Sequence, residues 1–381
     1  MVNAAFTGGG TGGHIFPGLA VAAELKNRFT GRDFRLFWIG SCAGIDRGIV
    51  EEAGVEFFGV PSGKLRRYFS LRTILDFFRI IASFFAARKI LKREKANVLF
   101  SKGGFVSVPP CAAAASLGIP VYTHESDFSP GLATRLNARY VSRTGGKIFT
   151  AYEETGSFFP RKARSFVTVS GNPIRAVFRG ANAAQGREFL KAGEKERILL
   201  VLGGSQGSHE INALIRAVLH DLSEIYTVVH QSGPGQSWDL PNTEKYKTFP
   251  FIKEEMPHVL AAAEIVAGRS GAGIWEWAAL GKPMVLIPLS GSGTRGDQME
   301  NARFFEKAGA AIVIMGDVDK PQELVRAVRT LACDAQKRQA MADASRKIGK
   351  LDSADIIAGA IENDLGQRTK NIGSAKIKSF K

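Results

Sequence analysis

Short apolar runs alternate along the chain with longer segments whose apolar residues recur at helical spacing. The runs that predict strands are 4–6, 34–39, 56–60, 97–101, 120–123, 166–169, 198–202, 226–230, 265–267, 284–287 and 311–315. Strands that alternate with helices are typical of a parallel sheet with helices on both faces. The sequence therefore predicts an α/β protein. Because the pattern restarts after residue 196, it predicts two Rossmann-like, doubly wound domains.

The predicted first domain covers 1–175 together with about 352–366, and the predicted second domain covers 176–351. The polar segment 181–196 is interpreted as the first helix and turn of the second domain. The last residues, 367–381, are basic and are expected to form a disordered tail.

A glycine-rich loop connects the first predicted strand to the first predicted helix. Its sequence is Thr7-Gly8-Gly9-Gly10-Thr11-Gly12-Gly13-His14-Ile15-Phe16-Pro17. Glycine lets another molecule touch the main chain, and the free N–H groups at a helix start favour an anion. The loop therefore predicts an anion site, and His14 places beside it an imidazole, a group that in its unperturbed form titrates near neutral pH.

The same loop fits a dinucleotide-binding pattern through Gly8, Gly10 and Gly13, which makes NAD an alternative ligand. That pattern requires a carboxylate at the end of the second strand to hold a ribose. The strand 34–39 ends in Gly40-Ser41-Cys42 instead, and Asp46 comes several residues too late. The sequence therefore disfavours NAD.

A second strand, glycine loop and helix follow in the other half. The loop Gly203-Gly204-Ser205-Gln206-Gly207-Ser208 lies between the strand 198–202 and a helix that begins near Glu210. Each predicted domain thus has its own anion site.

Polar and glycine residues follow other predicted strands of the first half. Because the carboxyl ends of parallel strands line the ligand site of a doubly wound sheet, these residues should converge. The converging residues are expected to be His14, Gly103, Gly104, Glu125 and Asp127.

The chain is strongly basic, with a formal net charge of +15 over 381 residues. Such a charge indicates an anionic partner. No zinc-finger or RNA-binding signature is present, so nucleic acid is not the expected partner. Three scattered cysteines indicate a reducing compartment and no zinc or disulfide framework. The N-terminus lacks the pattern of a signal peptide.

The segment 64–95 mixes aromatic and basic residues. Its longest run without charge, 80–87, is far shorter than the ~20 residues of a spanning helix. It could pack in the core, or lie on a membrane with aromatics in the leaflet and basic groups on lipid phosphates; we expect peripheral membrane contact. The residues predicted to make that contact are Arg66, Arg67, Tyr68, Phe69, Phe77, Phe78, Arg79, Phe84 and Phe85.

The order of these motifs resembles the MurG family, which belongs to glycosyltransferase family 28. The similar stretches are 9–20, 103–107, 124–125, 171–175, 203–207, 251–252, 269–272 and 296–302. The resemblance implies a GT-B fold whose last helix crosses back to the first domain. It also implies inverting, cofactor-free and metal-independent transfer of GlcNAc from UDP-GlcNAc to the C4 hydroxyl of the muramoyl unit of lipid I, forming lipid II. That reaction would take place at the cytoplasmic face of the inner membrane.

The resemblance also implies a donor site. Glu276 stands one residue closer to Ala272 than the family pattern has it. The residues implied to bind UDP-GlcNAc are Thr11, Gly12, Gly13, Arg175, Gly204, Ser205, Gln206, Gly207, Phe251, Ile252, Arg269, Ser270, Gly271, Ala272, Glu276, Asp297 and Gln298.

On the acceptor side, the lipid diphosphate is expected at Gly12, Gly13, Gly103, Gly104 and Asp127. The attacking hydroxyl must lose a proton, and a positioned base accelerates that step. His14 is the first candidate for the base, with Asp127 and Glu125 as alternatives. Many family members have Asn in place of Asp127.

Three other functions stay open at this point. A related GT-B transferase could glycosylate a diacylglycerol lipid, which offers no diphosphate to the residues 103–104 and 124–127. A membrane-docked binding protein with a decayed site is the non-enzyme alternative, and the intact loops, His14 and Gln298 speak against it. A basic nucleic-acid binder is the last option.

Overall fold

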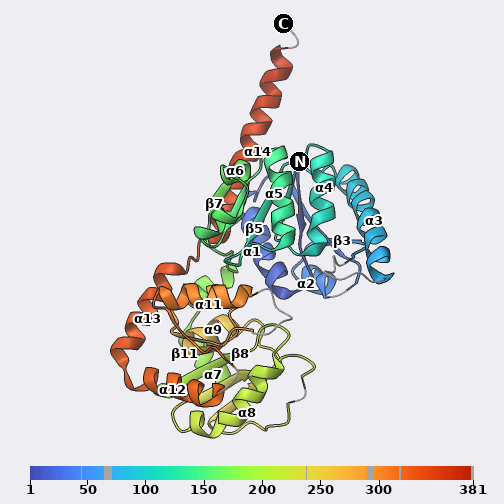
Figure 1. Ribbon diagram of the computed structural model, residues 1–381. Helices are drawn as coiled ribbons and strands as arrows, with labels where there is room; N and C mark the ends of the chain where they lie inside the picture. The colour runs from blue at the N-terminus through green and yellow to red at the C-terminus, as the bar shows by residue number, and fades with distance from the viewer. Residues whose placement is uncertain (44, 64–70, 237, 290–295, 317–318, 379–381) are drawn as a thin grey trace. The chain divides into compact units, whose positions relative to one another are not determined.

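The computed structural model describes residues 1–43, 45–63, 71–236, 238–289, 296–316 and 319–378 (Figure 1). The chain divides into two compact units. Unit 1 comprises 1–175 and 352–381, and unit 2 comprises 176–351. Each unit is built on one parallel sheet covered by helices, which confirms the predicted fold class.

Unit 1 contains a seven-stranded parallel sheet in the order β3-β2-β1-β4-β5-β6-β7. Its strands are β1 (Val2–Thr7), β2 (Phe34–Ser41), β3 (Glu56–Val60), β4 (Val98–Ser101), β5 (Val121–Glu125), β6 (Ile148–Thr150) and β7 (Val167–Val169). Its helices are α1 (Gly12–Arg28), α2 (Asp46–Glu52), α3 (Leu71–Arg93), η1 (Phe105–Ser107), α4 (Val108–Ser116), α5 (Leu132–Thr144), η2 (Glu154–Phe158), α6 (Arg161–Arg164) and α14 (Ser353–Lys378).

Helices cover both faces of this sheet, so its central strands β1 and β4 are buried on both sides and consist mostly of apolar residues. On one face α1 and α14 pack on residues such as Phe6, Trp38 and Phe100. On the other face α3, α4 and α5 pack on residues such as Phe37 and Leu99.

The last helix, α14, belongs to unit 1 although it follows unit 2 in sequence. Arg28 of α1 forms ion pairs with Asp355 (2.9 Å) and Glu362 (3.1 Å), and Tyr122 of β5 donates a hydrogen bond to Asp364 (2.8 Å). This helix is the predicted crossing back to the first domain. It continues to Lys378, through most of the segment that was expected to form a tail. That segment contains no proline, and a helix already formed extends at little cost.

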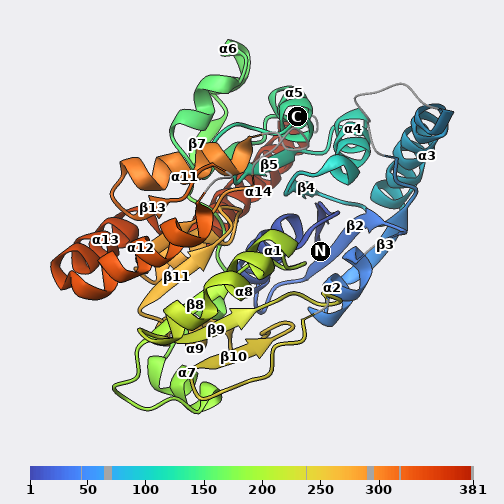
Figure 2. The ribbon, with the colours of Figure 1, turned by 60° about the horizontal axis from the view of Figure 1, so that its bottom comes forward.

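Unit 2 contains a six-stranded parallel sheet in the order β10-β9-β8-β11-β12-β13 (Figure 2). Its strands are β8 (Ile198–Leu202), β9 (Thr227–Gln231), β10 (Tyr246–Phe249), β11 (Ile265–Gly268), β12 (Met284–Leu286) and β13 (Ala311–Val313). Its helices are η3 (Ala176–Gly180), α7 (Ala183–Leu190), α8 (His209–Ser223), α9 (Met256–Ala262), α10 (Ile274–Ala279), α11 (Asp297–Lys307), α12 (Lys320–Cys333) and α13 (Ala335–Ile348).

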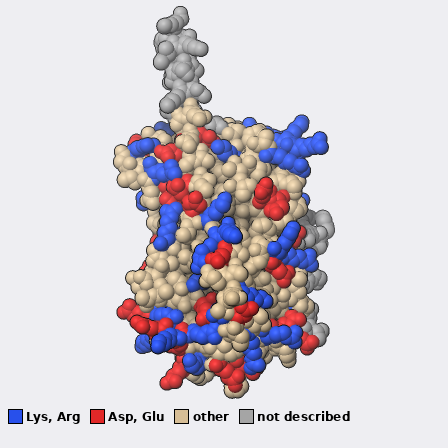
Figure 3. Space-filling model, turned by 90° about the vertical axis from the view of Figure 1, so that its left-hand side faces the viewer, with Lys and Arg blue, Asp and Glu red and all other residues tan. Residues whose placement is uncertain are grey.

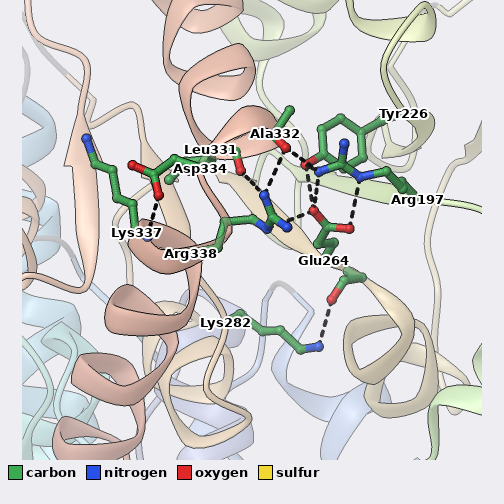
Figure 4. A network of polar contacts seen from close by, with 10 residues as sticks. Arg197, Tyr226, Glu264, Lys282, Leu331, Ala332, Asp334, Lys337 and Arg338 are labelled. Atoms are coloured by element: carbon green, nitrogen blue, oxygen red, sulfur yellow. Dashed lines mark hydrogen bonds and ion pairs between the residues drawn. The ribbon is translucent and has the colours of Figure 1, made fainter.

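A polar network fastens α12 and α13 to the sheet of unit 2 (Figure 4). The Glu264 carboxylate accepts hydrogen bonds from Arg197 Nε (3.1 Å) and the Tyr226 hydroxyl (2.9 Å), and pairs with Arg338 Nε (3.0 Å). Arg197 also donates to the Ala332 carbonyl at the end of α12 (3.0 Å). Burial opposes ionisation, but these donors hold the pKa of Glu264 below its usual range. The residues of this network are not among those predicted to bind the donor or the acceptor.

Basic and acidic side chains are interspersed on the face drawn in Figure 3. The net charge of +15 is therefore not gathered into one patch on that face.

Both sheets reverse their strand order next to their first strand. In unit 1 the reversal lies between β1 and β4, and in unit 2 it lies between β8 and β11. Ligands of doubly wound sheets bind at the carboxyl ends of the strands at such a point. The glycine loops 8–13, 103–104 and 203–207 and the motif 269–272 follow these four strands.

Candidate active site

The first glycine loop runs from the end of β1 at Thr7 to the start of α1 at Gly12. Buried Asp46 of α2 holds it in place, because its carboxylate accepts the N–H groups of Gly10 (2.9 Å) and Ser41 (3.3 Å). A Cβ at Gly9 would overlap that carboxylate. Asp46, which comes too late in sequence to hold a ribose, therefore shapes the loop instead.

The second glycine loop follows β4 and touches the first. Gly103 and Gly104 both have positive φ, at 90° and 78°. A Cβ on Gly104 would lie 2.6 Å from the Gly9 carbonyl oxygen and 3.3 Å from His14 Cδ2. The half-buried His14 ring thus lies against the second loop, and the structure brings together the residues that the sequence placed at these strand ends.

The end of β5 completes this edge of the sheet. The Glu125 carboxylate accepts three backbone N–H groups, from Ser126 (2.9 Å), Asp127 (3.1 Å) and Gly131 (3.0 Å). Both of its oxygens are engaged in holding the segment 126–131. Of the three predicted base candidates, Glu125 is therefore the one that the fold uses as a scaffold, whereas His14 and Asp127 are half-buried.

His124 is a structural neighbour of this edge. Its ring is fully buried, and Nε2 lies 2.9 Å from the Gly171 carbonyl oxygen. Burial and the positive charge of Lys102 lower the pKa of His124 well below its usual range, so the ring is neutral.

The remaining predicted residues of unit 1 flank the same edge. Thr11 is exposed just before α1, and its side chain does not cap the helix. The Arg175 guanidinium lies over the Phe16 ring, 5.3 Å from its centroid. Arg175 therefore stands beside the start of α1, where an anion would be expected.

In unit 2 the loop 203–208 connects β8 to α8. Gly204 and Gly207 have positive φ, at 97° and 73°, and a Cβ on Gly207 would overlap the Ser232 carbonyl oxygen. Ser208 caps the 15-residue helix α8 by accepting the Ile211 N–H (3.3 Å). The exposed Gly204 and Gln206 and the half-buried Ser205 thus lie at a capped helix N-terminus, which favours an anion.

Arg269 supports this loop from inside. Its buried guanidinium donates to Ser208 Oγ (2.9 Å), to the Ile287 carbonyl (3.1 Å) and to Glu210 (2.5 Å). Lys320 pairs with the same Glu210 carboxylate at 2.6 Å. Burial acts in the opposite direction, but hydrogen bonds from Lys320 and Arg269 keep the pKa of Glu210 below its usual range. Arg269 was predicted to contact UDP-GlcNAc, but the hydrogen bonds of its guanidinium go to protein groups. The roles of Glu210 and Lys320 in holding this loop were not predicted from the sequence.

Gln231, at the end of β9, connects two predicted parts of the donor site. Its Oε1 accepts the Ile252 N–H (2.9 Å), and its Nε2 lies 3.5 Å from the Gly204 carbonyl oxygen. Ile252 is buried, whereas the neighbouring Phe251 is 36% exposed. Sequence analysis missed Gln231, because an amide in a strand gives no sequence signal of its partners.

Buried His230 supports the loop next to it and gives a testable pH dependence. Its ring lies 3.1 Å from Asn212 Oδ1 and 3.0 Å from the Tyr246 hydroxyl, and Asn212 binds the Ser232 carbonyl. Burial lowers the pKa of His230 to about 4, against about 6.5 in an unfolded chain. Between about pH 4 and pH 6.5 the unfolded state binds more protons than the folded state. The contribution of the neutral His230 ring to the free energy of unfolding is therefore complete above about pH 6.5 and is lost as the pH falls towards 4.

We expect this effect to lower the free energy of unfolding by on the order of 3 kcal/mol between pH 6.5 and 4. Urea unfolding followed by tryptophan fluorescence at several pH values would measure it, since three of the four tryptophans (Trp238, Trp275 and Trp277) lie in unit 2. The variant His230→Gln should show a shallower pH dependence. If the free energy of unfolding changed equally with pH in the wild type and in His230→Gln, the role given to His230 would be contradicted.

The last predicted donor residues follow β11 and open α11. Ser270 donates to the Gln298 carbonyl (2.7 Å), and the Gln298 side chain accepts the Leu289 N–H (3.0 Å). Asp297 begins α11 after Gly296, and Glu276 is half-buried in the short helix α10. Gly271 and Ala272 lie between these elements. The structure therefore brings the predicted donor residues of unit 2 to one edge of its sheet, where their contacts to a ligand remain a prediction.

The described part of the basic and aromatic segment forms α3. Phe77, Phe78 and Phe85 are 58%, 62% and 64% exposed, and Arg79 is exposed as well. Phe84 is half-buried and packs on the core, so it faces inward rather than outward. Arg66, Arg67, Tyr68 and Phe69 lie outside the described residues. Among the helices described, none has the length and apolar character needed to cross a bilayer.

Within the described ranges, no cluster of three or more His, Cys, Asp or Glu side chains is arranged to hold a metal ion.

Comparisons with known proteins agree with this architecture. Residues 4–145 match the glycosyltransferase family 28 N-terminal domain, and residues 198–357 match the glycosyltransferase family 28 C-terminal domain. The UDP-N-acetylglucosamine--N-acetylmuramyl-(pentapeptide) pyrophosphoryl-undecaprenol N-acetylglucosamine transferase of Treponema denticola is 42% identical, over 96% of this chain and 99% of its own. The protein of the same name from Legionella pneumophila is 37% identical, over 96% and 98%.

Solved structures share the fold. The crystal structure of Acinetobacter baumannii MurG aligns with a TM-score of 0.70 at 24% identity, covering 95% of this chain and 100% of that one. A UDP-GlcNAc 2-epimerase from Neisseria meningitidis, bound to UDP-GlcNAc, aligns with a TM-score of 0.64 at 14% identity, over 95% and 99%. At these identities the likeness shows the fold alone, whereas the matched family models and the sequence relatives decide the family. The chain belongs to glycosyltransferase family 28.

Proposed function

We propose that this chain transfers GlcNAc from UDP-GlcNAc to the C4 hydroxyl of the muramoyl unit of lipid I, with inversion at the sugar carbon, and so forms lipid II of peptidoglycan synthesis. The observation that carries this proposal is the glycine loop at a helix N-terminus beside each strand-order reversal. A transfer between two diphosphate-bearing substrates needs two such anion sites. The names of the relatives give the same donor and acceptor.

Unit 2 is the proposed donor domain. The N–H groups of the loop 203–208 and the Ser205 hydroxyl would hold the diphosphate of UDP-GlcNAc, and Phe251 and Ile252 would contact the uracil. When the sugar departs, negative charge develops on the diphosphate. A preorganised donor at such a charge contributes roughly 3–4 kcal/mol. This is why we propose that the reaction needs no metal ion.

Unit 1 is the proposed acceptor domain. The acceptor O4 forms a bond to C1 of GlcNAc as the bond from C1 to the diphosphate breaks, and the hydroxyl proton passes to His14. UDP leaves with the electron pair of the broken bond. His14 is favoured over Glu125 as the base because the Glu125 oxygens already accept three N–H groups.

Transfer of labelled GlcNAc from UDP-GlcNAc to lipid I, with EDTA present, tests the proposal. Diacylglycerol is the control acceptor and UDP-glucose the control donor. Labelled lipid II is the expected product. Folded protein that is stabilised by UDP but transfers nothing to lipid I, or that glycosylates diacylglycerol instead, would overturn the proposal.

We further propose that α3 docks the chain on the anionic inner leaflet of the membrane, at its cytoplasmic face. Phe77, Phe78 and Phe85 would enter the leaflet, and Arg79 with neighbouring basic residues would meet lipid phosphates. Water is an unfavourable environment for three large aromatic side chains exposed on one helix, and a leaflet would bury them. Each basic group near an anionic leaflet contributes roughly 1 kcal/mol to binding.

Replacing Phe77, Phe78 and Phe85 together with Ser should weaken binding to anionic vesicles at least about tenfold, since burial of a full aromatic side chain is worth roughly 1.5–3 kcal/mol. Co-sedimentation with vesicles measures the change. The matched control replaces the exposed Val177 and Met315 of unit 2 with Ser. Equal vesicle binding by the triple variant and the control would contradict a role of α3.

A further inference from the structure

Lys102 has an unusual position for a lysine. It stands between the end of β4 and Gly103, and its N–H donates to the Thr7 carbonyl at the end of β1 (2.9 Å). Its Cβ lies 3.2 Å from the position that a Cβ on Gly8 would take. The residue is only 1% exposed. Its side chain therefore begins directly beneath the contact between the two glycine loops of unit 1.

The buried ammonium of Lys102 lacks the partners that such a group normally has. Among the residues that the structure describes, no hydrogen bond and no ion pair within 4.0 Å reaches it. Lys282 of unit 2 gives the contrast, because its ammonium donates to the carbonyls of Ala261 and Ala263, each at 2.7 Å. A buried charge without a partner is costly, so an unpaired ammonium beside a ligand site indicates an anionic ligand.

The charged neighbours of Lys102 do not serve as that partner. Burial lowers the pKa of Lys102, and the charges of Glu125 and Asp127 raise it only in part, since neither carboxylate forms an ion pair with it. The Glu125 carboxylate is occupied by three backbone N–H groups. His124 is neutral. Without Lys102, the two carboxylates would leave this edge of the sheet negative, which would repel an anionic substrate.

We propose that Lys102 supplies the positive charge that binds the diphosphate of the lipid acceptor at the two glycine loops of unit 1. The inference rests on the proposed function for the identity of the acceptor, whereas the diphosphate site itself is argued from the burial of Lys102 and from its lack of an ion-pair partner among the described residues. Lys102 is then a binding residue for the acceptor and takes no part in donor binding.

The test uses the purified full chain and two diphosphate probes, farnesyl diphosphate and inorganic pyrophosphate. Titrations are made with and without saturating UDP, which fills the nucleotide site. Lys102→Met removes the charge and keeps an unbranched side chain of similar length, and Lys102→Gln is the second variant if the first does not fold. Stabilisation by UDP shows that a variant is folded. Lys282→Met is the matched control for loss of a buried lysine.

With UDP present, we expect Lys102→Met to bind farnesyl diphosphate about 10–100-fold more weakly than the wild type, the range for loss of a hydrogen bond to a charged group. Lys282→Met should bind it as the wild type does. In the transfer assay, the KM for lipid I should rise by the same factor, while the KM for UDP-GlcNAc stays within about twofold.

Unchanged binding of farnesyl diphosphate by a folded Lys102 variant would overturn the inference. The inference would also be overturned if the difference in farnesyl diphosphate binding between the wild type and the Lys102 variant disappeared in saturating UDP. The probe would then occupy the diphosphate site of the nucleotide. Failure of the wild type to use lipid I, with Lys102-dependent binding of farnesyl diphosphate intact, would instead overturn the proposed function and leave the diphosphate site standing.

Discussion

Replacing His14 with Ala is expected to lower kcat for GlcNAc transfer about 10²–10⁴-fold, the usual contribution of a positioned general base. His14 stands in the first turn of α1 and its ring lies against Gly103 and Gly104, at the edge where the acceptor diphosphate is proposed. Steady-state kinetics with lipid I would measure the loss. Stabilisation by UDP should not change, because the predicted diphosphate loop for the donor is in unit 2.

Two further variants separate the candidates for the base. Asp127→Asn keeps the shape of the side chain, and Glu125→Gln removes the charge from a carboxylate that holds three N–H groups. We expect Asp127→Asn to retain kcat within about tenfold and Glu125→Gln to lower the melting temperature. A large loss of kcat in Asp127→Asn together with a small loss in His14→Ala would assign the base to Asp127.

The sequence pattern predicted the sheets and the glycine loops well, because buried parallel strands form nearly continuous apolar runs. The restart of the pattern after residue 196 predicted the two domains, whereas the strand order of each sheet came from the structure. Two strands were missed. β6 (Ile148–Thr150) has only three residues, and β10 (Tyr246–Phe249) contains Lys247 and Thr248, so neither forms an apolar run.

The parts of the site that sequence could not predict depend on contacts between distant segments. Asp46 binds Gly10 across 36 residues, and Gln231 binds Ile252 across 21. The charge of Lys102 became informative only when its burial was known. No local spacing encodes such pairings, because each is set by which strands lie side by side.

Several motif residues turned out to hold the loops in place. Arg269 and Glu125 were predicted to meet substrate, yet their visible hydrogen bonds go to Ser208 and Ile287, and to the N–H groups of 126–131, respectively. A motif contains both the groups that touch a ligand and the groups that shape the loop around it. The two kinds require different tests: loss of catalysis for the first and loss of stability for the second.

Gly207 provides such a stability test with a control three residues away. An Ala at Gly207 would be forced into a positive φ of 73°, and its Cβ would overlap the Ser232 carbonyl oxygen. An Ala at Gly204 would suffer a similar φ of 97° but would meet no atom within 4 Å. Positive φ costs an ordinary residue roughly 1–2 kcal/mol, and overpacking adds roughly 1–3 kcal/mol.

We therefore expect Gly207→Ala to lower the free energy of unfolding by about 2–5 kcal/mol and Gly204→Ala by about 1–2 kcal/mol. Urea unfolding followed by the tryptophans of unit 2 would measure both values. Gly207→Ala should also lose most of the stabilisation by UDP, because the backbone of the proposed diphosphate loop must move to relieve the overlap. Equal loss of stability in both variants would mean that φ alone limits this loop and that contact with Ser232 does not fix its shape.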